Sequence, residues 1–140
     1  MSTILVLLIA VIIFIYTLYY VIIGVENEDF EEFPLKYKDL NITEHPIEKF
    51  STYYYIGKTY FSTTKFPLTK IYFYKNFLVA KYRGHAQVFE YNKNTMLIKK
   101  DIRGNRVSIL TELGEAYFFV NKKQMVIFNF LLEEASKQKH

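Results

Sequence analysis

The sequence predicts an N-terminal transmembrane α-helix followed by a mainly antiparallel β domain of about seven strands with an amphipathic C-terminal helix. Three observations carry this prediction. An uncharged apolar run of 20 residues stands near the N-terminus. Short runs of aromatic and β-branched residues, bounded by turn residues, follow from Tyr53 onward. Near the C-terminus the apolar period changes from that of strands to that of a helix.

Residues 4–23 form the candidate anchor, ILVLLIAVIIFIYTLYYVII, which contains no charge, glycine or proline. As a helix it rises about 30 Å, which matches the hydrocarbon thickness of a bilayer. Tyr16, Tyr19 and Tyr20 fall in its last two turns, and such amphipathic rings favour the headgroup level, so we expect this end at the membrane interface. A cleaved signal peptide is the competing interpretation. It is disfavoured because no basic stretch precedes the run and no small-x-small cleavage site follows it.

The orientation of the anchor is predicted from two lysines. Lys36 and Lys38 lie within about 15 residues after the apolar run, whereas the three residues before it contain no base. Counting bases alone places the C-terminal domain on the cytoplasmic, or organellar inner, side of the membrane. Five acids lie closer to the run than either lysine.

Composition divides the chain into a transmembrane anchor (1–24), an acidic neck (25–52) and a basic β domain (53–140). Residues 26–50 hold eight acids against three bases, a net charge of −5, whereas residues 51–140 hold six acids against 15 bases, a net charge of +9. Because Pro34 and Pro46 interrupt regular structure, we expect the neck to be a solvated linker. The alternative is that its acids pair with the basic domain or hold it away from an anionic lipid surface.

The strands of the β domain are predicted from runs that alternate between aromatic or β-branched residues and polar ones. We expect strands over 59–64, 70–74, 77–82, 86–91, 96–102, 106–113 and 116–120. Turns are expected at Lys75-Asn76, Arg83-Gly84, 92–94, Gly104-Asn105 and Gly114-Glu115.

The C-terminal helix is predicted to begin at a capping box formed by Asn121 and Gln124. The residues at helical spacing after it are apolar, namely Met125, Phe128, Leu131, Leu132 and Ala135. This stripe has to be buried, and the open end of a curved sheet is the expected place.

This order of elements resembles the pleckstrin-homology-like fold, in particular the small bacterial PH-like domains, over residues 59–138. The resemblance is carried by the hairpin KIYFYKNFLVAKYRG, the stretch HAQVFEYNKNTMLI, the hairpin IRGNRVSILTELGEAYFFV and the helix QMVIFNFLLEEA. It implies a binding or scaffolding module, often at a membrane. Phosphoinositide-binding PH domains carry a basic cluster in the first hairpin loop. The corresponding turn here, Lys75-Asn76, is too short and too poor in bases to supply one.

The sequence predicts no catalytic residue, no metal site and no cofactor. There is no cysteine, so disulfides and thiolate chemistry are excluded. His45, His85 and His140 lack partners at metal-ligand spacing. No phosphate-binding glycine motif and no G-x-S-x-G nucleophile motif is present.

Basic and aromatic side chains form the predicted interaction surface. It comprises Lys99, Lys100, Arg103 and Arg106 around one turn, Lys81 and Arg83 at another strand end, and the triple Tyr53, Tyr54 and Tyr55. The alternative is a solvated lysine-rich surface. A membrane anchor disfavours nucleic acid as the partner.

The expected function is a non-enzymatic, membrane-anchored interaction or scaffold module, an accessory subunit of a larger membrane complex. Its expected partners are the lipid bilayer and another protein. One alternative is an immunity-type or protection-type membrane protein that binds a toxin or peptide. Another is a peripheral domain that binds anionic lipid headgroups.

Overall fold

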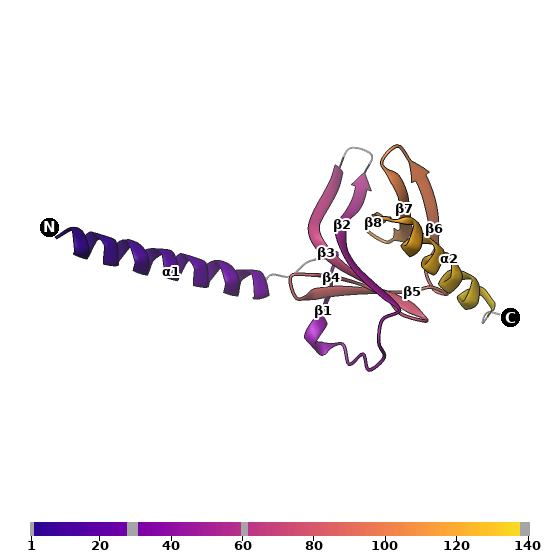
Figure 1. The fold of residues 1–140 in the computed structure, drawn as a ribbon, viewed down its shortest axis with the longest axis horizontal. Helices are drawn as coiled ribbons and strands as arrows, with labels where there is room; N and C mark the ends of the chain where they lie inside the picture. Colours follow the sequence, from indigo (N-terminus) through magenta and orange to yellow (C-terminus); the bar gives the residue numbers. More distant parts are fainter. Residues whose placement is uncertain (1, 28–30, 60–61, 138–140) are drawn as a thin grey trace.

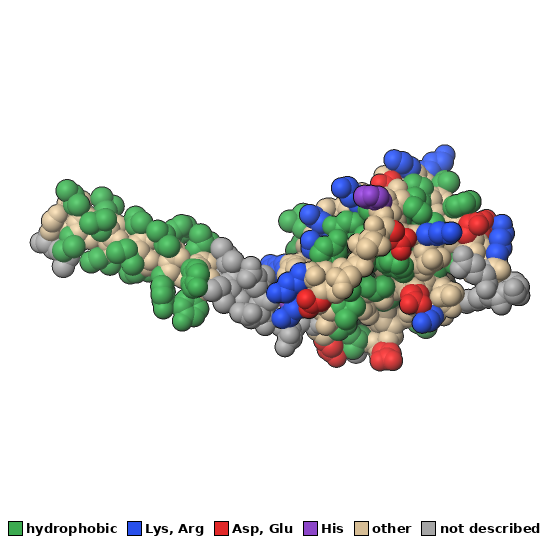
Figure 2. All heavy atoms as spheres, turned by 90° about the horizontal axis from the view of Figure 1, so that it is seen from below, with side chains coloured by type: hydrophobic (Ala, Val, Ile, Leu, Met, Phe, Trp, Pro, Cys, Tyr) green, Lys and Arg blue, Asp and Glu red, His purple; other side chains and the backbone are tan. Residues whose placement is uncertain are grey.

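The computed structural model describes residues 2–27, 31–59 and 62–137, and its elements run from an N-terminal helix through a curved sheet to a C-terminal helix (Figure 1). Helix α1 (Thr3–Asn27) projects away from the sheet, and α2 (Lys122–Lys137) packs against it (Figure 1). Within α1, the segment Thr3–Val21 is long and apolar enough to span a bilayer, and none of it is buried. A signal sequence meets the same criterion. Apolar side chains cover the visible described part of α1, and charged ones lie on the domain (Figure 2).

Eight strands form one antiparallel sheet in the order β1-β5-β4-β3-β2-β8-β7-β6. Their bounds are β1 Leu35–Lys36, β2 Glu48–Thr59, β3 Ser62–Phe73, β4 Phe77–Tyr82, β5 His85–Glu90, β6 Met96–Asp101, β7 Gly104–Thr111 and β8 Gly114–Val120. The predicted fold class is confirmed, with one strand more than expected. Two strands lie outside the predicted runs: the two-residue β1, which comes from the neck and pairs with β5, and β2, whose residues before Thr59 were not predicted as a strand.

The predicted strand over 59–64 is wrong. Thr59 ends β2 and pairs with Ser62, which begins β3. The stretch therefore contains the ends of two strands of one hairpin, and its residues 60 and 61 lie outside the described residues. Both strands are 12 residues long. Pro67 interrupts the alternation of side chains within β3. At this point the register between β3 and β2 shifts, and Leu68 has a φ of 58°. A proline has no N–H to donate to the backbone hydrogen bonds between strands, and the shift in register accommodates it.

Two turns lie just before the glycine-containing pairs at which they were predicted, Gly104-Asn105 and Gly114-Glu115. Asp101 pairs with Gly104 and Thr111 pairs with Gly114, so residues 102–103 and 112–113 make the turns. Gly104 and Gly114 begin the returning strands with φ values of 129° and 135°, a conformation that favours glycine.

The interior of the curved sheet is rich in aromatic residues, and α2 packs against it. The largest fully buried side chains include Tyr54, Phe33, Phe73, Phe118 and Phe128. The predicted capping box of α2 is confirmed. The Gln124 N–H donates to Asn121 Oδ1 at 2.8 Å, and the Asn121 N–H donates to Gln124 Oε1 at 2.9 Å. On α2, Phe128, Leu131 and Ala135 are buried, as the helical spacing predicts.

Much of the expected linker folds onto the domain. Phe33 is fully buried, and its ring lies 5.0 Å from that of Phe66 and 5.5 Å from that of Tyr82. Beyond it, Tyr37, Leu40 and Ile42 pack on a second apolar cluster on the sheet. Six residue steps separate the end of α1 at Asn27 from Phe33. An extended chain spans roughly 3.3–3.6 Å per residue, so the domain core begins within about 20 Å of the helix end.

Candidate functional site

Several of the predicted site residues share the outer side of strands β2, β8, β7 and β6. The register pairs Tyr55 with Tyr117, and Arg106 with both Phe119 and Lys99. Because side chains alternate between the two sides of a sheet, these residues face the same way. We call this surface the aromatic–basic face, and it comprises Tyr53, Tyr55, Lys65, Lys99, Asp101, Arg103, Arg106, Glu115, Tyr117 and Phe119.

Partly exposed rings pack against one another on this face. Tyr55 and Tyr117 stack with their centroids 4.9 Å apart and their planes 11° apart. Phe119 meets both rings edge-on, at 6.2 Å from Tyr55 and 6.3 Å from Tyr117. Tyr53 continues the row along β2, with its centroid 6.4 Å from that of Tyr55 and half of its surface exposed. The rings therefore hold one another in fixed orientations.

Cationic groups lie over these rings. The Arg106 guanidinium lies 4.5 Å from the Tyr117 centroid, and that of Arg103 lies 4.9 Å from Phe119. Lys65 Nζ lies 4.2 Å from the Tyr53 centroid. Such cation–π contacts orient the charges above an aromatic surface.

Glu115 fixes the cations at the β6–β7 side of the face. Its Oε1 accepts a hydrogen bond from Ser108 Oγ at 2.6 Å and another from Lys99 Nζ at 3.2 Å. Arg106 Nη2 lies 3.5 Å from the same oxygen, and Arg106 Nη1 lies 3.7 Å from Asp101. The Ser108 hydrogen bond, aided by the Lys99 and Arg106 charges and opposed by partial burial, lowers the pKa of Glu115. The carboxylate is therefore charged at neutral pH.

The face keeps a net positive charge, because four bases (Lys65, Lys99, Arg103 and Arg106) stand against two acids (Asp101 and Glu115), which leaves +2. Two predicted site residues of these same strands, Tyr54 and Lys100, lie on the other side of the sheet. Tyr54 is fully buried, since it alternates with its two neighbours along β2. Lys100 is exposed, but neighbouring side chains alternate along a strand, so its side chain lies on the opposite side of β6 from that of Lys99.

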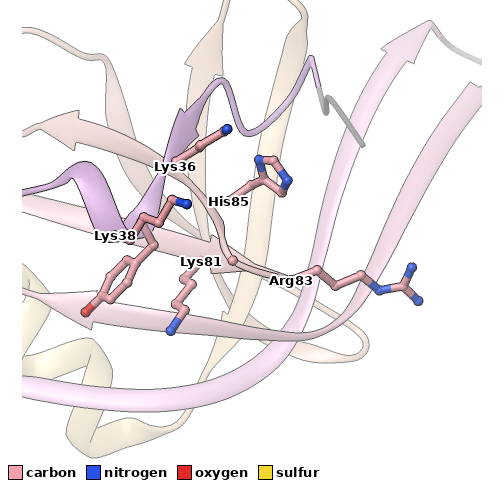
Figure 3. Close-up of a pocket in the computed structure, with 7 residues that line it drawn as sticks. Lys36, Lys38, Lys81, Arg83 and His85 are labelled. Carbon is pink, nitrogen blue, oxygen red and sulfur yellow. The ribbon is translucent and has the colours of Figure 1, made fainter. Parts of the chain in front are cut away.

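Lys81 and Arg83 lie at a second, separate site. Together with Lys36, Tyr37, Lys38, Gly84 and His85 they line a pocket of about 360 Å³. We call it the basic pocket. Lys36, Tyr37 and Lys38 come from the neck, and the others come from the β4–β5 hairpin (Figure 3). The Lys36–His85 pair of the β1–β5 ladder and a 2.9 Å hydrogen bond from the Tyr37 N–H to the Gly84 carbonyl join the two segments.

The positive charge of the basic pocket is not balanced by the described side chains. No carboxylate is among the described residues that line the pocket, and within the described chain no ion pair forms at Lys36, Lys38, Lys81 or Arg83. Lys81 Nζ lies 4.0 Å from the Tyr37 ring centroid. Partial burial, followed by the nearby charge of Lys70, lowers the pKa of Lys81. This surface has the electrostatic character of an anion-binding site.

The three tyrosines predicted at the membrane interface are all exposed on α1, and the ring centroids of Tyr16 and Tyr20 lie 5.0 Å apart.

Among the described residues, no three His, Cys, Asp or Glu side chains gather in an arrangement that could hold a metal ion. His45 is exposed, His85 lines the basic pocket, and His140 lies outside the described residues.

The sequence showed the bases and the tyrosine triple, but it did not show Tyr117 and Phe119 as members of the same surface. From the sequence, Lys36 and Lys38 served only to predict the orientation of the anchor in the membrane. Their place at the basic pocket follows from the pairing of β1 with β5.

Comparison of the chain with protein-family models, with curated proteins and with solved structures found no match in any of the three.

Proposed function

We propose that this chain is a single-pass membrane protein whose β domain docks an acidic protein partner close to the bilayer through the aromatic–basic face. In this role it is a non-enzymatic accessory or scaffold subunit. The observation that carries the proposal is the stacked pair Tyr55 and Tyr117, with the Arg106 guanidinium over the Tyr117 ring, on the outer side of the sheet.

Composition and rigidity support a protein interface. Tyrosine, phenylalanine and arginine are the residue types enriched at such interfaces and at their energetic centres. Rings that already hold one another lose little conformational freedom on binding. The net charge of +2 on the face favours an acidic partner surface. The seven long strands followed by a C-terminal helix support the PH-like resemblance, which implies the same kind of module.

The anchor supports action at a membrane. Thr3–Val21 is long and apolar enough to span, and Phe33 ties the domain within about 20 Å of the helix end. Lys36 and Lys38 favour a domain on the cytoplasmic, or organellar inner, side.

Gentle-detergent extraction of the tagged full chain, followed by native sizing and mass spectrometry, tests this function. The wild type is expected in a complex with fixed partners, and the double variant Tyr55→Ser/Tyr117→Ser is expected to lose them. Phe130→Ser is the matched control, because Phe130 is a 60% exposed aromatic residue on α2, away from the face. A wild-type monomer, or a complex that survives the double variant, would contradict the proposal.

The basic pocket favours a second candidate function, in which the domain binds anionic lipid headgroups of its own bilayer. The short connection to α1 keeps this pocket near the membrane, and its lysines are not paired with described carboxylates. Lysine acylation of the full chain in nanodiscs tests it. Lys36, Lys38 and Lys81 should be protected in phosphatidylserine nanodiscs and not in phosphatidylcholine ones, whereas exposed Lys122 should react equally in both. Equal labelling of all four would exclude this function.

A further inference from the structure

A cavity of about 560 Å³ lies where the neck, β2, β5 and the β7–β8 turn meet. It is separate from the aromatic–basic face and from the basic pocket, with which it shares none of the described lining residues. Glu32 and Pro34 line it from the neck, Tyr54 and Ile56 from β2, Phe89 from β5 and Glu112 from the turn. Its volume lies within the range of small-molecule binding sites.

The Tyr54 hydroxyl is the unusual group of this cavity. Tyr54 is fully buried, and its Oη has no hydrogen-bond partner in the described structure. Tyr91, also buried, differs, because its hydroxyl donates to the Tyr74 carbonyl at 2.8 Å. A buried hydroxyl without a partner destabilises a fold, and a phenylalanine would fill the same space without that cost. Burial, followed by the charge of Glu32, raises the pKa of Tyr54, so the group stays a neutral hydroxyl.

The lining combines carboxylates with an apolar wall. Glu31, Glu32 and Glu112 line the cavity, and none of the described side chains that line it is a lysine or arginine. The aromatic ring of Phe89 and the aliphatic side chains of Ile56, Leu110 and Leu113 supply the apolar part. Carboxylates beside aromatic and aliphatic side chains complement a cation carried on an apolar stem.

We propose that this cavity binds an alkylammonium group on an apolar stem. The stem lies against Ile56 and Phe89, and the ammonium donates a hydrogen bond to Tyr54 Oη while the carboxylates of Glu32 and Glu112 balance its charge. Because Tyr54 Oη is buried beneath the cavity lining, this hydrogen bond requires the side chains over it to move aside as the ligand enters. Two sources carry this chemistry, a lysine side chain of a peptide and a free amphiphilic amine.

The test is a titration of the full chain in maltoside micelles, which carry no ammonium group, followed by NMR of labelled Ile56 and Leu113 methyls. The probes are n-butylammonium, neutral n-butanol and a peptide with one central lysine. At least one ammonium probe is expected to bind, with n-butanol at least ~10-fold weaker, because it carries no charge. Tighter binding of the peptide assigns the peptide source, and tighter binding of butylammonium assigns the free amine.

Three variants locate the binding. Tyr54→Phe is expected to weaken it about 10-fold while the fold stays intact, because only the hydroxyl is removed. Glu112→Gln alters an exposed side chain and is expected to weaken it a few-fold. Glu133→Gln, an exposed glutamate on α2, is the matched control and should bind like the wild type. No binding by either ammonium probe, or affinities unchanged in both Tyr54→Phe and Glu112→Gln, would overturn the proposal. Neither result bears on the docking of a partner at the aromatic–basic face.

Discussion

Tyr55 and Tyr117 stand opposite each other on β2 and β8, and their rings stack 4.9 Å apart on the outer side of the sheet. Cross-strand aromatic pairs contribute about 0.5–1.5 kcal/mol beyond their buried area. A double-mutant cycle with Tyr55→Ala, Tyr117→Ala and both changes together is expected to give a coupling free energy of that size in urea unfolding. Additive single effects would show that the stacking does not stabilise the fold.

Glu115 makes the stability of the domain depend on pH. Its folded-state pKa is lowered, chiefly by the Ser108 hydrogen bond, so its contribution is fully present above the ordinary value of 4.5. That contribution is lost as the pH falls through the folded-state pKa. Glu115→Gln should therefore lower the free energy of unfolding at pH 7, by about 1 kcal/mol or less for this partly exposed group.

Urea unfolding of wild type and Glu115→Gln over pH 2–7 measures this difference, which should shrink below pH ~4.5. Glu133→Gln on α2 is the control and should track the wild type throughout. If the difference in the free energy of unfolding between wild type and Glu115→Gln stayed constant across the whole pH range, Glu115 would not be the group that makes stability depend on pH.

Phe33→Ala tests whether the neck belongs to the domain. Phe33 is fully buried, so its loss should lower the free energy of unfolding by about 3–5 kcal/mol. Leu35→Ala is the matched control, because Leu35 is 40% exposed, and it should cost clearly less. Similar small costs for both variants in chemical denaturation would mean that the neck is a solvated linker after all.

Tyr54→Phe should stabilise the fold, because it removes the unpartnered buried hydroxyl and keeps the ring. The expected gain is about 1 kcal/mol, visible as a higher melting temperature in circular dichroism. Tyr91→Phe is the comparison, since it leaves the Tyr74 carbonyl without its donor and should destabilise. A destabilising Tyr54→Phe would mean that the hydroxyl already has a partner, such as a buried water.

Local patterns in the sequence were sufficient to predict helix α1, the strands from Phe77 onward and the capped helix α2. An uncharged apolar run, two-residue periodicity and the Asn121–Gln124 capping box are each contained in one continuous stretch of sequence. The β2–β3 hairpin was missed because Pro67 breaks the alternation where the strands shift register. The candidate surfaces needed pairings between distant segments. Tyr117 reaches Tyr55 only through the β2–β8 ladder, and Lys36 reaches the basic pocket only through β1.

Site-specific photo-crosslinking in native membranes tests whether a protein partner docks on the aromatic–basic face. A photoreactive phenylalanine analogue replaces Tyr53, which is half exposed at the edge of the aromatic–basic face, or Phe130 on α2 as the control. One dominant, acidic protein is expected to be crosslinked from position 53 and to be lost when Arg103→Glu is added, and no such product is expected from position 130. Equal products from both positions, or none from position 53, would contradict docking through this face.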